Sequence, residues 1–305
     1  MSDRILANWN GATLYLDEIK ISPLDRGFIF GDAVYEVIRI YRGNMWLAQE
    51  HFDRLERSLR SLEINADLNA IKSSLLDVFT KSSVVDGFIY LQVSRGTAPR
   101  THYFPAESVS PNYIIWCQKY DDSWLYPFWE NGISVISTPD LRWARRDIKT
   151  VNLLGNCLAM EKAKQANASE AILIDKDGTV SEATSNNVFG VKDGVIFTTP
   201  NSHKILPGIT REYTLTLAKE MNIPVIEKTF TYEELLHADE LFITGSIMEI
   251  MPVTKVDQCM IRQGVVGRIT RELMKQFFIN KNKNNLSIYT LKVNVEEQLC
   301  RPKFF

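Results

Sequence analysis

The sequence has few residues that could bind a metal ion or form a disulfide framework. It contains four cysteines and four histidines. The cysteines are widely spaced, no two form a Cys-x-x-Cys pair, and no histidines cluster beside them. We therefore expect reduced thiols and no metal site. The cysteines are Cys117, Cys157, Cys259 and Cys300.

Long apolar runs and a strong net charge are also missing. No run approaches the length of a membrane span, and the amino terminus has no apolar core of signal-peptide length. The net charge is only −2, so no global field favours nucleic acid or an anionic membrane. We expect a cytoplasmic protein whose partners are small molecules, with neither nucleic acid nor a membrane among them.

Four common catalytic signatures are absent as well. The chain has no GxGxxG, GxxxxGK[ST], HExxH or GxSxG motif, so dinucleotide-binding, P-loop, zincin and hydrolase-elbow interpretations have no support. What remains is a chain of 305 residues, 45% hydrophobic and 24% charged. That composition indicates a globular protein with one large or two medium domains.

Hydrophobic periodicity predicts a mixture of helices and strands. Segments with β-branched and aromatic residues indicate strands, and apolar residues at helical spacing indicate amphipathic helices. A linker rich in polar and aromatic residues separates a domain at 1–119 from one at 130–280. The predicted linker is 120–129, and a tail with a Lys/Asn run follows at 281–305. The predicted strands include 33–41, 87–94, 112–118 and 133–138, and the predicted helices include 47–62, 68–81, 153–166, 267–278 and one that begins near Thr210.

Lys149 stands out from the other lysines because of its neighbours. Most lysines are solvated surface charges. Lys149 instead lies between Ile148 and Val151, after a cationic stretch and just before a predicted helix. Apolar and cationic surroundings disfavour the ammonium form, which lowers the pKa and makes the amine a usable nucleophile. A lysine of this kind forms Schiff bases with carbonyl compounds.

The segment Asp-Ile-Lys-Thr-Val-Asn-Leu-Leu resembles the cofactor-lysine segment of the class IV (fold type IV) aminotransferases. Within this family the similarity is closest to the D-amino-acid aminotransferases, and it covers about residues 4–278. The resemblance implies a mixed α/β fold with a small N-terminal α/β domain and a larger C-terminal, barrel-like mixed domain. It also implies pyridoxal 5′-phosphate held on Lys149 as an internal aldimine, and a homodimer with active sites near the interface. The tail at 281–305 lies outside the part of the chain that the resemblance covers.

The resemblance assigns further residues to the cofactor. Arg54, in an EHxxRL-like pattern, matches an arginine that binds the cofactor phosphate, and Glu182, in an SExTSN-like segment, matches the glutamate that bonds the pyridine nitrogen. Ile209 and Thr210 begin a helix after Pro-Gly, where free backbone donors suit a phosphate, although Thr210 could also be a simple helix cap. Ser246 matches a second phosphate loop.

Three residues are assigned to the substrate by the same resemblance. Tyr35, on the predicted strand 33–41, and Arg100 and His102, in an Arg-Gly-x-x-x-Arg-x-His loop, match residues that bind the α-carboxylate. In the D-amino-acid enzymes this loop reaches across the dimer interface. The implied reaction is transfer of the amino group of a D-amino acid, such as D-alanine, to a 2-oxo acid, such as 2-oxoglutarate.

Several alternatives stay open on sequence grounds. A branched-chain L-amino-acid aminotransferase shares the roles of Lys149 and Glu182, but the loop with Arg100 and His102 argues against it. Aminodeoxychorismate lyase has a different strand after its Phe-Gly-Asp segment. An (R)-amine transaminase would need no carboxylate clamp. A catalytically silent binding protein is the remaining alternative.

Overall fold

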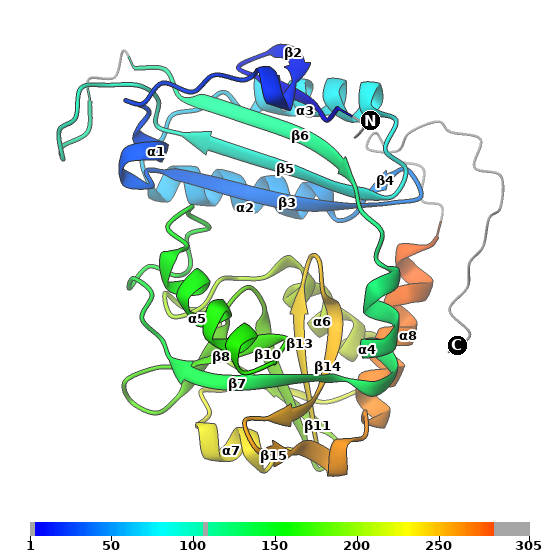
Figure 1. The fold of residues 1–305 in the computed structure, drawn as a ribbon. Helices are drawn as coiled ribbons and strands as arrows, with labels where there is room; N and C mark the ends of the chain where they lie inside the picture. The colour runs from blue at the N-terminus through cyan, green and yellow to red at the C-terminus, as the bar shows by residue number, and fades with distance from the viewer. Residues whose placement is uncertain (1–3, 106–108, 284–305) are drawn as a thin grey trace. The chain divides into compact units, whose positions relative to one another are not determined.

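The computed structural model describes residues 4–105 and 109–283 of the chain, which form two compact units (Figure 1). The first unit contains residues 4–121 together with the short segment Ile148–Asn152. The second unit contains Asp122–Asp147 and Leu153–Lys283. The segment that carries Lys149 thus belongs to the first unit, although the residues on both sides of it belong to the second.

The first unit is built on an antiparallel sheet of six strands in the order β2-β1-β6-β5-β3-β4. Two of its inner strands, β3 and β5, are rich in Val, Ile, Tyr and Phe, which suit a pleated and half-buried surface. The strands are β1 (Leu6–Trp9), β2 (Ala12–Tyr15), β3 (Ala33–Tyr41), β4 (Asn44–Met45), β5 (Gly87–Ser94) and β6 (Asn112–Lys119).

Two amphipathic helices, α2 (Ala48–Ser61) and α3 (Leu68–Ser82), bury their apolar sides against this sheet (Figure 1). Because strand residues alternate between faces, every second residue of β3 enters the core with the helices, while Tyr35 lies on the other face. A short helix, α1 (Arg26–Phe30), and a 3-10 turn, η1 (Leu16–Glu18), precede β3. The core includes Val34, Ile38, Ile40, Phe52, Leu55, Leu59, Leu75 and Val78.

The second unit contains a curled mixed sheet of nine strands, with helices packed around it (Figure 1). The order is β12-β11-β10-β13-β14-β7-β8-β9, and β15 pairs with β14. Strand β7 pairs in parallel with β8 and β14, and β11 with β12; the other pairs are antiparallel. The strands are β7 (Ile133–Pro139), β8 (Glu170–Ile174), β9 (Val180–Ala183), β10 (Asn187–Lys192), β11 (Val195–Thr198), β12 (Val225–Glu227), β13 (Glu240–Gly245), β14 (Glu249–Val256) and β15 (Cys259–Met260). The helices are η2 (Ser123–Leu125), α4 (Tyr126–Asn131), α5 (Leu154–Gln165), α6 (Ile209–Glu220), α7 (Tyr232–Leu236), η3 (Ile261–Gly264) and α8 (Arg268–Lys281).

The mixed α/β fold predicted from the sequence is confirmed, and so are its main elements. Strands 33–41 and 87–94 match β3 and β5 in full, and the amphipathic helices agree within a few residues. Helix α4 occupies part of the stretch interpreted as a linker. Of the predicted tail 281–305, residues 284–305 lie outside the described residues. Within the described ranges, every helix is too short or too polar to span a membrane.

A buried polar cluster joins β3 to α2 inside the first unit. Glu36 accepts hydrogen bonds from Nε and Nη2 of Arg54, at 2.8 and 2.7 Å, and from Nδ1 of His51, at 2.6 Å. Burial alone would raise the pKa of Glu36, but Arg54 and His51 outweigh it and hold that pKa well below its usual range. Burial lowers the pKa of His51, with Glu36 opposing the shift in part. The imidazole is therefore neutral in the folded protein and donates Nδ1–H to the carboxylate.

This cluster predicts a pH dependence of stability. Because the folded-state pKa of His51 lies below its ordinary value of 6.5, the unfolded chain binds more protons below that pH. The free energy of unfolding should therefore fall as the pH drops from 7 towards 5.5, with His51 contributing up to about 1.4 kcal/mol per pH unit. His51→Asn keeps a donor near Glu36 but cannot titrate, so urea unfolding of this variant should depend less on pH over this range.

His237→Asn is the matched control, because His237 is exposed and its Nδ1 contacts only the carbonyl of Glu233 in the preceding turn. An unchanged pH dependence in His51→Asn would show that His51 is not neutral in the fold.

Candidate active site

The backbone on either side of Lys149 pairs with the edge of β3 in the first unit. Thr150 forms a bridge with Val34, and the amide of Tyr35 donates to the carbonyl of Lys149 at 3.0 Å. The amide of Val151 donates to the carbonyl of Ala33 at 3.2 Å. These bonds hold the segment in an extended form, and they fix the position of Lys149 relative to the sheet.

The side chain of Lys149 lies against Tyr35. Its Nζ is 4.2 Å from the centre of the Tyr35 ring, and the side chain is half-buried. Tyr35 in turn stacks on Tyr90 of β5, with ring centres 5.7 Å apart. The Lys149 amide also points to the hydroxyl of Ser58 on α2, at 3.4 Å. The structure therefore brings together two predicted site residues, Lys149 and Tyr35.

Arg54 lies one helical turn before Ser58, on the buried side of α2. Its two hydrogen bonds to Glu36 are bidentate and set the plane of the guanidinium. Sequence reasoning singled out Arg54 but missed Glu36, whose position between Tyr35 and Val37 gave it the pattern of an ordinary strand residue. The phosphate role of Arg54 stays a prediction.

Arg100 and His102 lie together on the surface of the first unit. Both rest on Phe30 of α1: the Arg100 Cζ is 5.4 Å from the ring centre, and the His102 ring centre is 5.7 Å from it. Arg26, which sequence reasoning missed, donates to the carbonyl of Thr101 at 2.8 Å and thereby holds the loop. Both predicted carboxylate-binding side chains are exposed.

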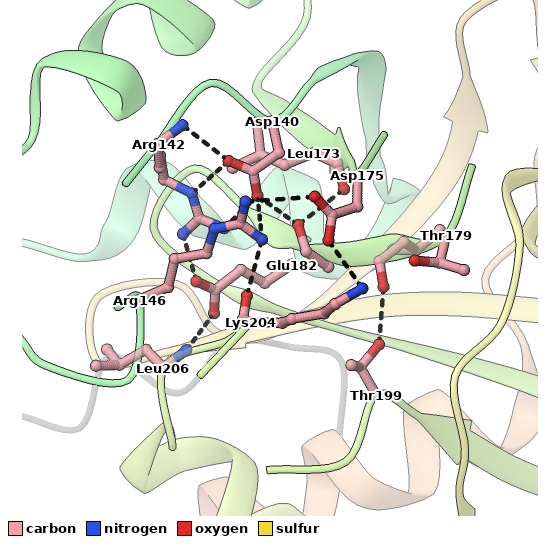
Figure 2. Close-up of polar contacts among 12 residues, drawn as sticks. Asp140, Arg142, Arg146, Leu173, Asp175, Thr179, Glu182, Thr199, Lys204 and Leu206 are labelled. Carbon is pink, nitrogen blue, oxygen red and sulfur yellow. Dashed lines mark hydrogen bonds and ion pairs between the residues drawn. The ribbon is translucent and has the colours of Figure 1, made fainter. Parts of the chain in front are cut away.

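In the second unit, Glu182 of β9 is a buried carboxylate with three donors. It accepts from Nη1 of Arg142 and from the backbone amide of Leu206, at 3.0 Å for the latter (Figure 2). It also accepts from the side-chain amide of Asn187 at 3.1 Å. Burial raises the pKa of Glu182, and Arg142 offsets the shift only in part. Sequence reasoning found Glu182 but missed Arg142 and Asn187. The one available sequence signal for Arg142 was that its charge lies close in sequence to the Lys149 segment.

The N-terminus of α6 has no side-chain cap among the residues that the structure describes. Its N-cap, Gly208, makes no side-chain cap hydrogen bond, and Ile209 and Thr210 are buried. The start of α8 offers a comparison within the same unit, because there Glu240 accepts from the amides of Ile269 and Thr270 at 3.2 and 2.8 Å. A carboxylate thus accepts hydrogen bonds from the first amides of α8, whereas among the described residues no side chain caps the first amides of α6. A bound anion at α6 would occupy the equivalent position.

Two glycines bring the start of α6 and the turn after β13 against neighbouring asparagines. A Cβ on Gly208 would lie 2.0 Å from Oδ1 of Asn187, and one on Gly245 would lie 2.2 Å from Oδ1 of Asn186. Ser246 follows Gly245 in the turn to β14. Since any larger residue would collide, these close approaches hold the start of α6 beside Asn187 and the turn after β13 beside Asn186.

Comparison with known proteins identifies the family of this chain. The profile of the family described as amino-transferase class IV matches residues 33–256. The chain belongs to the class IV aminotransferase family. D-alanine aminotransferases are similar over 272 residues: that of Staphylococcus epidermidis is 43% identical, covering 88% of this chain and 95% of that protein. That of Bacillus licheniformis is 42% identical, covering 87% and 93%.

Solved structures show the same fold. The branched-chain amino acid aminotransferase of Escherichia coli has a TM-score of 0.87 at 27% identity, covering 92% of this chain and 97% of that one. The T.th. branched-chain amino acid aminotransferase with pyridoxamine 5′-phosphate has a TM-score of 0.84 at 25% identity, covering 92% and 95%. Family membership confirms the predicted cofactor, pyridoxal 5′-phosphate.

The residues of this aminotransferase fit that cofactor. A free lysine amine is available for the aldehyde, a buried carboxylate for the ring nitrogen, and an uncapped helix start for the phosphate. In addition, the hydroxyl of Thr244, next to Gly245, is buried without a hydrogen-bond partner among the described residues. The nucleophile, the acceptor and the donors needed by a phosphorylated pyridine aldehyde are therefore present.

Glu170 organises the turn that leads to these asparagines. Its Oε1 accepts from the amides of Ala171 and Thr184, at 2.8 and 3.2 Å, and from the Thr184 hydroxyl. Its Oε2 accepts from Ser185 Oγ at 3.2 Å and Asn186 Nδ2 at 2.7 Å. Both oxygens thus face donors only, which is an arrangement that suits an ionised carboxylate and no amide.

Glu170→Gln should therefore destabilise the aminotransferase. Either orientation of the new amide points its NH₂ group at a donor, and a buried unsatisfied group costs about 1–3 kcal/mol. The urea midpoint should fall while the slope of the transition stays unchanged. Glu161→Gln, at an exposed position of α5, is the control; equal midpoints in the two variants would contradict this account.

Proposed function

We propose that this chain transfers the amino group of a D-amino acid, such as D-alanine, to a 2-oxo acid, such as 2-oxoglutarate. The observation that carries the proposal is the pairing of the Lys149 segment with β3, which holds the amine against Tyr35. The 41–43% identity to D-alanine aminotransferases over most of the chain supports the choice of substrate.

Each site residue has a role in this proposal. Lys149 would bind the cofactor covalently. Once the substrate amine has displaced it from the cofactor, its freed Nζ would accept the proton from the substrate α-carbon as general base. When bound, pyridoxal phosphate supplies the electron sink for the bond that is broken. Glu182 keeps the ring nitrogen protonated. The phosphate is held by Arg54, Ile209, Thr210 and Ser246.

The substrate carboxylate is the proposed ligand of Tyr35, Arg100 and His102. A guanidinium and an imidazole side by side on Phe30 supply N–H donors for a carboxylate, and their exposure leaves them accessible. D-specificity follows when the carboxylate is held on the side that turns the α-hydrogen towards the lysine. The family resemblance adds a cytoplasmic homodimer to this proposal.

A branched-chain L-amino-acid aminotransferase is the second candidate, favoured by the similarity to the solved structure from Escherichia coli. It shares the roles of Lys149 and Glu182, so these residues do not separate the two functions. The two functions differ in the carboxylate clamp and in the stereochemistry of the amino donor.

The visible absorption of the purified protein tests the function directly. We expect D-alanine, added without any keto acid, to remove the cofactor's absorption band and to yield pyruvate, because a half-reaction stops once the amino group is transferred. L-alanine and L-leucine should leave the band unchanged. Lys149→Ala should give no borohydride-stable adduct by mass spectrometry. Bleaching by L-leucine instead would establish the branched-chain function and refute the D-amino-acid proposal.

Arg100→Met tests the carboxylate clamp. Losing one charged hydrogen bond of about 1.5–3 kcal/mol should raise the KM for D-alanine ~10- to 100-fold. Arg60→Met is the control, because Arg60 is exposed and its ion pair is with Glu56 on the same helix. An unchanged KM in Arg100→Met would remove Arg100 from the substrate site.

A further inference from the structure

One guanidinium in the second unit is shared by two buried carboxylates (Figure 2). Arg142 uses Nε and Nη2 to bind Asp140, at 3.0 and 2.7 Å, and Nη1 to bind Glu182. Their side chains are 7%, 0% and 6% exposed for Arg142, Asp140 and Glu182. Asp140 and Arg142 follow the end of β7, and Glu182 lies in β9. The pairing is thus shielded from water, which strengthens every charge interaction in it.

Asp140 is held firmly as a carboxylate. It also accepts from Ser181 Oγ at 2.7 Å and from the backbone amide of Arg142 at 3.1 Å, and Arg146 Nη1 lies 3.3 Å away. Burial would raise the pKa of Asp140, but the hydrogen bonds and charge of Arg142 outweigh it, and the pKa lies below its usual range. Asp140 therefore competes with Glu182 for the charge of Arg142.

Among the described residues, Glu182 has no second cation within hydrogen-bonding distance to compensate it. Its other donors, Asn187 and the Leu206 amide, are neutral. Burial is the main cause of the raised pKa of Glu182; Arg142 lowers that pKa, and Asp140 raises it. The remaining charges form an outer layer, in which Arg146 and Lys204 contact Asp175, at 3.4 and 3.0 Å.

We propose that Asp140 and Arg142 are positioning residues that together set how strongly Glu182 attracts a cationic N–H group. Arg142 keeps Glu182 ionised and fixes its orientation, and Asp140 withdraws part of the compensating charge, so that Glu182 retains affinity for a protonated ring nitrogen. The proposal rests on the cofactor role of Glu182 proposed above. Asp140 and Arg142 act through Glu182 and touch neither substrate nor cofactor.

Opposite effects of two substitutions provide the test. In the full-length chain freed of cofactor, the protonation midpoint of Glu182 can be followed from its infrared carboxyl band, assigned as the band missing in Glu182→Gln. Asp140→Asn leaves Arg142 wholly to Glu182 and should lower the midpoint by about 1 pH unit or more. Arg142→Gln removes the cation and should raise it by about 1–3 units.

Asp175→Asn is the matched control, because it removes a carboxylate of the outer layer that contacts Arg146 and Lys204 but neither Arg142 nor Glu182. It should leave the midpoint unchanged. A loss of packing alone would not move the midpoint in opposite directions in the other two variants. Should Arg142→Gln fail to fold, the downward shift in Asp140→Asn alone decides. No shift, or an upward shift, in Asp140→Asn overturns the proposal.

Cofactor affinity separates this proposal from the function on which it rests. In titrations of the same variants with pyridoxal phosphate, Arg142→Gln should weaken binding ~10-fold or more, because a neutral Glu182 no longer attracts a protonated ring. Asp140→Asn should weaken it less, and Asp175→Asn not at all. Shifted midpoints with unchanged cofactor affinity would support the charge sharing and overturn the cofactor role of Glu182.

Discussion

The pairing of the Lys149 backbone with the edge of β3 is the constraint on which the proposed chemistry depends. A lysine side chain has four rotatable bonds and reaches many positions unless its backbone is held. Here three contacts, from Ala33, Val34 and Tyr35, fix the extended segment, and the Tyr35 ring lies against the amine. Pairing with the sheet therefore orders the Lys149 backbone before any substrate binds, so substrate binding does not have to supply that loss of conformational entropy.

Buried carboxylates recur throughout the protein, and their partners differ with their tasks. Glu36 pairs with Arg54 and His51, so its charge is fully matched. Glu170 faces hydroxyl and amide donors that hold a turn, and Glu240 satisfies the start of α8. Glu182 alone of these four shares its cation with another carboxylate. An incompletely compensated charge is costly in the interior, and such charges concentrate at functional sites.

Much of the fold could be predicted because its elements have strong local patterns. Strand β3 combines β-branched and aromatic residues without interruption, and α2 places Phe52, Leu55 and Leu59 at helical spacing. The short helix α4 was not predicted, because aromatic residues and Pro127 gave it the pattern of a linker. Short elements depend on their neighbours, whose contacts no local window contains.

The sequence by itself determined the family and the main strands and helices, and it singled out Lys149, because these depend on residue types at fixed spacing along the chain. Only the tertiary structure decided the partners of those residues. Glu36 and Arg54 lie 18 residues apart in sequence, and Arg142 and Glu182 lie 40 apart. Folding alone brings Arg142 between two carboxylates, since a shared charge requires three side chains to meet in a space without water.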